Sequence, residues 1–262
     1  IVKARREHPK GLISAALANM GERFGYYIMN AVLLLFLCSK FGISDDAAGW
    51  IYAVFYFLIY VLSLPGGMIA DKTQKYKGTI ISGLLVMALG YGLLSIPVFT
   101  ETTGEISWVL VFTCVALLII AFGNGLFKGN LQAIVGQMYD NFEAEAAKKG
   151  PEALAKAKSK RDSGFQIFYV FINIGGVIAP FVAPLLREFW LKAHNLAYNS
   201  DLPRLCHMFN ENQALSATDM DNLNKLAVEV GHSGAVDTSF CTQYLEIFNT
   251  GVHFSFIASV VA

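Results

Sequence analysis

The chain has 262 residues and no formal net charge; 55% of its residues are hydrophobic and 15% are charged. A soluble domain usually carries about 25% charged residues, and the mean hydropathy here is +0.48, so the composition argues against an ordinary soluble protein. Because basic residues are not in excess, nothing in the composition indicates binding to nucleic acid. The chain starts at Ile1 without an initiator Met or a signal-peptide pattern, so we expect a piece of a longer protein.

The first long apolar segment, residues 11–41, contains an acid–base pair near its middle. Glu22 and Arg23 are followed by Tyr26 and Tyr27 in the sequence GERFGYY. A charged side chain at membrane depth costs at least about 2.5 kcal/mol, so such residues usually mark a functional site. The pair therefore favours a water-lined transport pathway, with a purely structural ion pair between helices as the alternative.

Charge-free runs predict the membrane spans that follow. About 20 apolar residues are needed to cross roughly 30 Å of hydrocarbon. The runs of sufficient length are 47–70, 78–100, 106–127 and 163–186. With the first segment they give five spans, and a sixth is predicted to begin near Ile247 and to be cut off at Ala262 after about 24 Å of helix.

Lys and Arg residues gather in alternate loops. The basic regions are the N-terminus with Lys3, Arg5, Arg6 and Lys10, the loop 72–77 and the loop 148–161. By the positive-inside rule these loops are cytoplasmic, so the N-terminus is expected in the cytoplasm and residues 188–246 outside.

Two long connections interrupt the pattern of short loops. In 138–162, Ala, Glu and Lys residues favour a cytoplasmic helix after Pro151. In 188–246, which is more acidic than basic, a capping signal at Ser216 and helical apolar spacing predict short helices. The expected organisation is therefore 1–187 with spans one to five, 188–246 as a partly helical extracytoplasmic segment, and 247–262 as the truncated sixth span.

Cys206 and Cys241 both lie in the outer segment, in a compartment that permits disulfides. A bond between them would close a loop of about 35 residues and contribute on the order of 3–4 kcal/mol. Two unpaired, partly buried thiols are the alternative.

The fourth and fifth spans contain further polar residues. In GNGLFKGN the glycines allow close helix packing, and Lys128 is followed by residues without charge, which favours an inward-facing lysine over one that snorkels from a helix end. In the fifth span Gln166 and Asn173 share a helix face. Asn173 either hydrogen-bonds to another helix or lines the same cavity as Arg23.

These motifs together resemble the proton-dependent oligopeptide transporters of the major facilitator superfamily. GERFGYY resembles the family's ExxERFxYY motif, residues 66–78 its loop motif between helices two and three, GNGLFKGN its helix-four lysine segment, and RDSGFQIFYVFINIGG its helix-five signature. The motifs occur in the family's order. The chain departs from the pattern at Asn19, where the motif has its first Glu, at Gly129, where a Pro usually follows the lysine, and at Gln74, where the loop motif has Gly.

The resemblance implies an all-α membrane protein, specifically the N-terminal six-helix bundle of a twelve-helix transporter that alternates access to a central cavity. It implies proton-coupled symport of di- and tripeptides across the cell membrane. No bond is made or broken, so an enzyme is not expected, and neither is a metal or any cofactor besides the coupling proton. The implied partners are the peptide, membrane lipid and the C-terminal bundle of the same transporter.

The resemblance also assigns roles to particular residues. The substrate-binding residues would be Arg23, Tyr26, Tyr27, Tyr60, Lys128 and Asn173. Glu22 would pair with Lys128 or Arg23 and exchange a proton, which would free a cation for the peptide carboxylate, and Asp71 would act in gating. A carrier of nitrate or another small anion and a non-transporting membrane scaffold subunit are the alternative functions.

Overall fold

The computed structural model describes residues 8–98, 108–213 and 215–262, and the described residues form helices without strands. The basic residues Lys3, Arg5 and Arg6 lie outside the described part. The helices are α2 (Leu12–Phe41), α3 (Asp45–Val61), α4 (Ser63–Thr73), α5 (Tyr76–Ser95), α6 (Trp108–Ala147), α7 (Pro151–Ala193), α8 (Leu202–Asn210), α9 (Ala217–Glu229) and α10 (Thr238–Val261).

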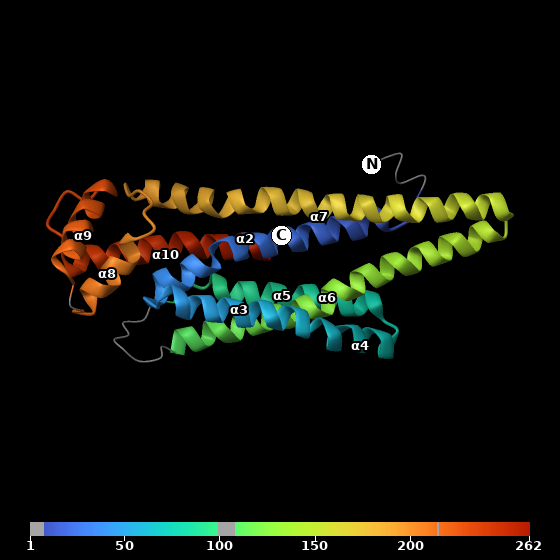
Figure 1. Ribbon diagram of the computed structural model, residues 1–262, viewed down its shortest axis with the longest axis horizontal. Helices are drawn as coiled ribbons and strands as arrows, with labels where there is room; N and C mark the ends of the chain where they lie inside the picture. Colours follow the sequence, from blue (N-terminus) through green and yellow to red (C-terminus); the bar gives the residue numbers. More distant parts are fainter. Residues whose placement is uncertain (1–7, 99–107, 214) are drawn as a thin grey trace.

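Five helical stretches in the described residues are long and apolar enough to cross a membrane: α2, α3 with α4, α5, α6 and α7. They coincide with the five predicted spans and confirm the all-α membrane fold. The helices run lengthwise through an elongated bundle (Figure 1). α10 packs against α2, α5 and α7, and it begins nine residues earlier than the predicted start near Ile247.

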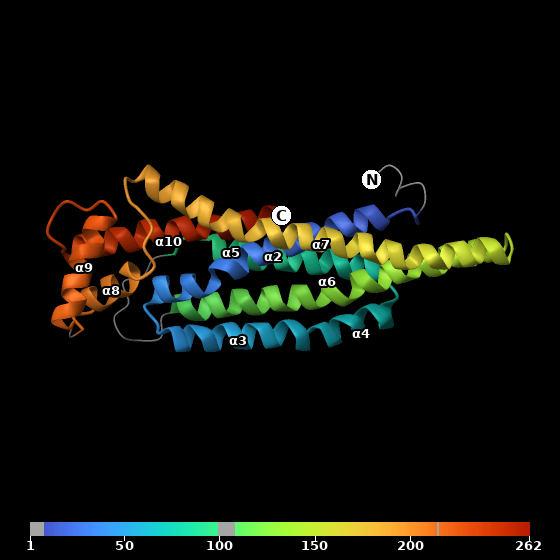
Figure 2. The same cartoon turned by 45° about the horizontal axis from the view of Figure 1, so that its top comes forward.

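The helix predicted after Pro151 is present, and the residues before it, expected as part of the connection 138–162, are helical up to Ala147 as well. α6 has 40 residues and continues to Ala147, and α7 has 43 residues and begins at Pro151. At 1.5 Å per residue each is about 60 Å long, roughly twice the hydrocarbon thickness. Their joined ends project beyond the rest of the bundle as a hairpin (Figure 2). Arg161 ties this hairpin together through ion pairs to Asp140 at 2.7 Å and Glu143 at 3.3 Å.

The second span is divided into α3 and α4 just before Pro65. Pro65 has no N–H to donate to the carbonyl one turn earlier, so the helix bends where α3 ends and α4 begins. Just beyond the bend, α4 lies so close to α6 that a β-carbon on Gly66 would overlap the carbonyl of Gly125. Asn130 of α6 donates to the Gly66 carbonyl at 3.0 Å. Close backbone contact through small residues is typical of membrane helices.

The outer segment is helical at α8 and α9, and Ser216 caps α9 as predicted by accepting a hydrogen bond from the Asp219 amide at 3.1 Å. Cys206 and Cys241 are both free, buried thiols in this structure. A hydrogen bond to Cys241 and burial raise the pKa of the Cys206 thiol. Packing of α8 on α10 brings the two cysteines together, and a disulfide between them stays a prediction.

Polar contacts attach this outer segment to the bundle. Ser39 on α2 donates to the Asn249 side chain on α10 at 2.8 Å, and the Asn249 amide donates to the Ser39 carbonyl at 3.1 Å. The His207 ring on α8 donates to the same carbonyl at 2.7 Å. His253 on α10 donates to the Leu94 carbonyl at the end of α5 at 2.6 Å. The ends of α2 and α5 nearest this segment therefore form one connected unit with α8 and α10.

Candidate functional site

Glu22 and Arg23 form a buried ion pair on α2. Arg23 Nε lies 2.5 Å from Glu22 Oε2, and Arg23 Nη2 donates to Glu22 Oε1 at 3.0 Å. The Glu22 side chain is 2% exposed and that of Arg23 is 11% exposed. A two-point contact between guanidinium and carboxylate is among the strongest side-chain interactions, and breaking it would leave a charge buried without its partner.

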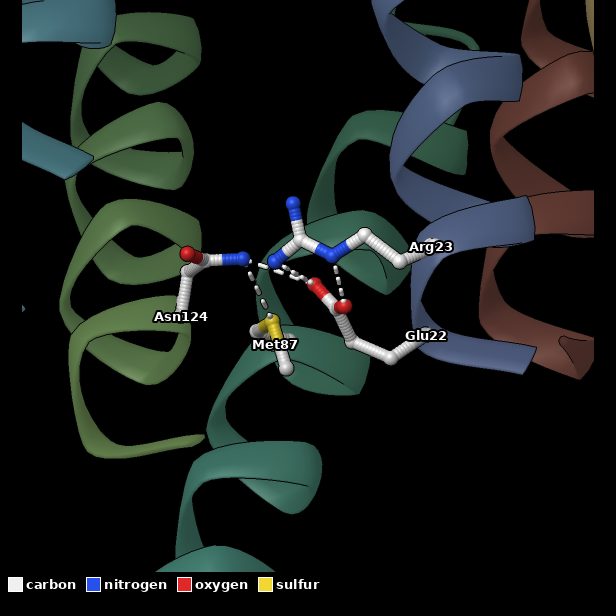
Figure 3. A network of polar contacts seen from close by, with 4 residues as sticks. All are labelled: Glu22, Arg23, Met87 and Asn124. Atoms are coloured by element: carbon white, nitrogen blue, oxygen red, sulfur yellow. Dashed lines mark hydrogen bonds and ion pairs between the residues drawn. The ribbon is translucent and has the colours of Figure 1, made fainter. Parts of the chain in front are cut away.

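Helix α6 supplies a third group to this pair. The Asn124 amide donates to Glu22 Oε1 at 2.7 Å and approaches the Met87 sulfur on α5 at 3.8 Å. Figure 3 shows these side chains meeting between the three helices. Asn124 was not among the residues predicted for the site. Its spacing of four from Lys128, which places both on one face of α6, is the signal that could have found it.

Aromatic rings extend the site from α2 to α3. The Arg23 guanidinium carbon lies 5.2 Å from the centre of the Tyr26 ring. Tyr26 contacts Tyr56 at 6.5 Å between ring centres, and Tyr56 contacts Tyr60 at 6.2 Å. Tyr56 and Tyr60 are one turn apart on α3, just before its bend, so their rings lie along the same face.

Lys128 completes this arrangement from α6. Its ammonium nitrogen lies 4.3 Å from the centre of the Tyr60 ring, a favourable cation–π geometry. Among the described residues it forms no ion pair with Glu22 within 4.0 Å, so the partner left open by the sequence, Arg23 or Lys128, is Arg23 here. The lysine is partly exposed, in contrast to the buried pair on α2.

Helix α7 approaches the site at Gly175 and Gly176. A β-carbon on Gly176 would lie 3.2 Å from the Tyr27 ring, and one on Gly175 would lie 2.9 Å from the Met20 carbonyl. Asn173, one turn before Gly176, is exposed. No hydrogen bond joins Asn173 to the other predicted site residues in the described part of the chain.

Two further buried residues belong to this region. Asn19, where the family motif has its first Glu, is 7% exposed and lies one turn before Arg23 on α2. Tyr91 on α5 is 4% exposed, and its hydroxyl has no hydrogen-bond partner within the described residues. It lies close enough to Glu22 and Arg23 to interact with their charges. Sequence reasoning missed Tyr91, because a lone tyrosine in an apolar span resembles ordinary core packing.

Asp71 lies in the last turn of α4, just before the turn to α5 and outside the buried pair. Its carboxylate accepts a hydrogen bond from Tyr76 at 2.6 Å, and Gln74 donates to its main-chain carbonyl at 2.6 Å. Gln74 has a φ of 54°, a left-handed conformation in which glycine is favoured. This geometry accounts for the glycine that the family's loop motif has at this position.

Comparison with known proteins finds related membrane transporters. The model described as the POT family matches residues 77–202. Dipeptide and tripeptide permease B of Shigella dysenteriae serotype 1 (strain Sd197) is 31% identical over 193 residues, which are 74% of this chain and 34% of the permease. The uncharacterized transporter YclF of Bacillus subtilis (strain 168) is 29% identical over 69% of this chain and 33% of its own length.

Solved structures share the fold. A bacterial homologue of the human drug peptide transporters PepT1 and PepT2 superposes with a TM-score of 0.56 at 24% identity, covering 96% of this chain and 49% of that chain. A structure described under substrate recognition in proton dependent oligopeptide transporters gives 0.56 at 25% identity, covering 96% and 48%. The chain thus spans about a third of the curated relatives and about half of the solved ones, and it belongs to the POT family of membrane transporters.

Proposed function

We propose that this chain forms one half of a transporter that carries di- and tripeptides across the cell membrane together with protons. The observation that carries the proposal is the buried Glu22–Arg23 pair, flanked by Lys128 on the Tyr60 ring. The relatives named as dipeptide and tripeptide permeases support the substrate class. A scaffold role would leave two cations and a carboxylate buried or half-buried in apolar helices without a use for their charge.

The residues suit a peptide with free ends. Arg23 and Lys128 are charge-assisted donors for the C-terminal carboxylate, and the guanidinium can make two parallel hydrogen bonds. Tyr26, Tyr27 and Tyr60 offer apolar ring faces with hydroxyl groups, which tolerate varied side chains. Asn173, exposed on α7, would contribute an amide for the peptide backbone.

Proton coupling follows from the pairing. While Glu22 is ionised, both of its oxygens are held by Arg23. Protonation removes the charge that Arg23 neutralises, so the guanidinium becomes available to the peptide carboxylate. Binding of the proton to Glu22 and of the peptide to Arg23 is then linked, because a buried cation without any anion is costly. The coupling ion is the proton, and the cycle requires no cofactor.

The rest of the transporter is part of the same proposal. The start of α2, the α4–α5 turn and the α6–α7 hairpin lie toward one end of the bundle (Figure 1), and the basic residues there favour a cytoplasmic location for that end and for the N-terminus. The C-terminal bundle would close the cavity over the exposed faces of Tyr60 and Asn173. Asp71 would act at the cytoplasmic end as a gating residue.

The test is uptake of a labelled dipeptide by the full-length transporter in proteoliposomes. An inward proton gradient should drive accumulation, and unlabelled di- and tripeptides should compete with the label, whereas free amino acids and nitrate should not. Nitrate uptake with no dipeptide uptake would establish the small-anion carrier instead. Transport of neither solute by correctly folded protein would favour the scaffold.

A further inference from the structure

Asn124 is a fully buried amide that contacts the acid of the buried pair. It is 0% exposed, and its amide nitrogen lies 2.7 Å from Glu22 Oε1 and 3.8 Å from the Met87 sulfur. Its amide oxygen has no hydrogen-bond partner within the described residues. A buried polar atom without a partner costs free energy, so this spare acceptor requires an explanation.

The Asn124 amide offers a suitable partner to each protonation state of Glu22. An ionised carboxylate only accepts hydrogen bonds, so the N–H side of Asn124 suits it. A protonated carboxyl group still accepts through one oxygen, but it also has an O–H that it can donate to the amide oxygen. The amide can present either side, because its terminal torsion has broad, nearly two-fold preferences.

We propose that Asn124 is a positioning residue for proton exchange at Glu22, whose amide N–H holds the ionised carboxylate and whose spare oxygen accepts the O–H once the acid is protonated. The proton binds to and leaves the Glu22 carboxyl group, and Asn124 itself neither gains nor loses one. This role would couple the charge on α2 to α6, the helix that also carries Lys128. The inference rests on the proposed function for its transport readout but not for its spectroscopic one.

Two substitutions separate this role from simple packing. Asn124→Leu keeps the approximate volume but removes both polar functions, and Asn124→Asp keeps the shape but replaces the donor with a second acid. If packing were the only role, Asn124→Asp would resemble the wild type more closely than Asn124→Leu does. If the amide serves Glu22, both variants should be altered.

The experiment is the pH dependence of proton-driven dipeptide uptake by the full-length transporter, with counterflow as the control for folding and binding. Asn124→Leu should shift the midpoint to higher pH by about 0.5 to 1 unit, because a hydrogen bond to the charged form is stronger than one to the neutral acid. Asn124→Asp should shift it at least as far, since neighbouring carboxylates disfavour ionisation. Counterflow of the same dipeptide reports separately how far each variant still folds and binds peptide.

An infrared titration of the Glu22 carboxyl stretch, assigned by its loss in Glu22→Gln, reports the same midpoint without any substrate. The Asn124 proposal is overturned if this midpoint is unchanged in both variants, even when peptide transport is confirmed. It is also overturned if counterflow and driven uptake fall together at a constant midpoint. A wild-type protein that transports no dipeptide would reject the proposed function, while the infrared shift would still decide the role of Asn124.

Discussion

Glu22 and Arg23 are adjacent in the chain, and this adjacency determines how the pair can respond to a proton. Neither side chain can move away with its helix while the other stays, so the pair is broken by protonation or by competition from another anion rather than by helix separation. The contact uses two nitrogens of one guanidinium, and the third nitrogen remains available for an incoming carboxylate. Arg23 can therefore exchange the Glu22 carboxylate for another carboxylate without any movement of its helix.

The charged residues of this site could be predicted from the sequence, whereas its neutral residues could not. Glu22, Arg23 and Lys128 stand out in apolar segments, because ionised groups there are expensive. Asn124 and Tyr91 carry no charge, and their involvement depends on how α5 and α6 are rotated against α2. That rotation is set by close packing, for example of Gly83 against Gly123, which hydropathy does not report.

At Lys128, substitution by Ala should reduce proton-driven peptide uptake at least tenfold. The variant loses the cation above the Tyr60 ring, a contact worth about 0.5–2 kcal/mol, and with it one of two donors for the peptide carboxylate. Initial uptake rates in proteoliposomes provide the measurement. Lys156→Ala, on the α6–α7 hairpin away from the site, is the control, and uptake by Lys128→Ala at the control rate would contradict the role.

At the level of elements, the sequence predicts where helices cross the membrane but not where they end. The span positions follow from the length of apolar runs, which is fixed by the bilayer. Ala, Glu and Lys favour helix in water as well, and they predicted the helix after Pro151. The continuation of α6 to Ala147 was missed because its charged residues follow the apolar run. Helix therefore extends through residues 138–147 and 151–162, beyond the apolar runs.

The contact between α4 and α6 predicts opposite results for two adjacent glycines. Gly66→Ala should lower stability by about 1–3 kcal/mol, because its methyl group would overlap the Gly125 backbone. Gly67→Ala meets no atom within 4 Å and should be neutral or stabilising by up to about 1 kcal/mol through helix propensity. Thermal unfolding of the detergent-solubilised protein measures both. Equal destabilisation would show that the two helices are not packed this closely.

The turn between α4 and α5 offers a test of gating. If Asp71 acts in gating as proposed, Asp71→Asn should slow transport more than it weakens peptide binding, because Asp71 lies in the last turn of α4 rather than at the buried pair. Tyr76→Phe removes the hydrogen bond to the same carboxylate but leaves its charge. Turnover and equilibrium binding are measured for both variants. Loss of binding with normal turnover in Asp71→Asn would reject the gating role.

Over the whole molecule, the two ends of the bundle differ. The α6–α7 hairpin lies at one end, and α8 and α9 lie at the opposite end (Figure 1). The outer helices are attached through Ser39, Asn249 and His207. In the proposed transporter, a bundle connected at the α8–α9 end and extended at the hairpin end would rock as a unit against a second bundle, as alternating access requires.

The central claim is that the Glu22–Arg23 pair couples protons to peptide movement. It is tested most directly by Glu22→Gln in the full-length transporter, with proton-driven uptake and counterflow of the same labelled dipeptide measured side by side. Gln cannot take up a proton, so driven uptake should fall to background while counterflow continues at a rate comparable to the wild type. Proton-driven uptake at the wild-type rate in this variant would contradict the account.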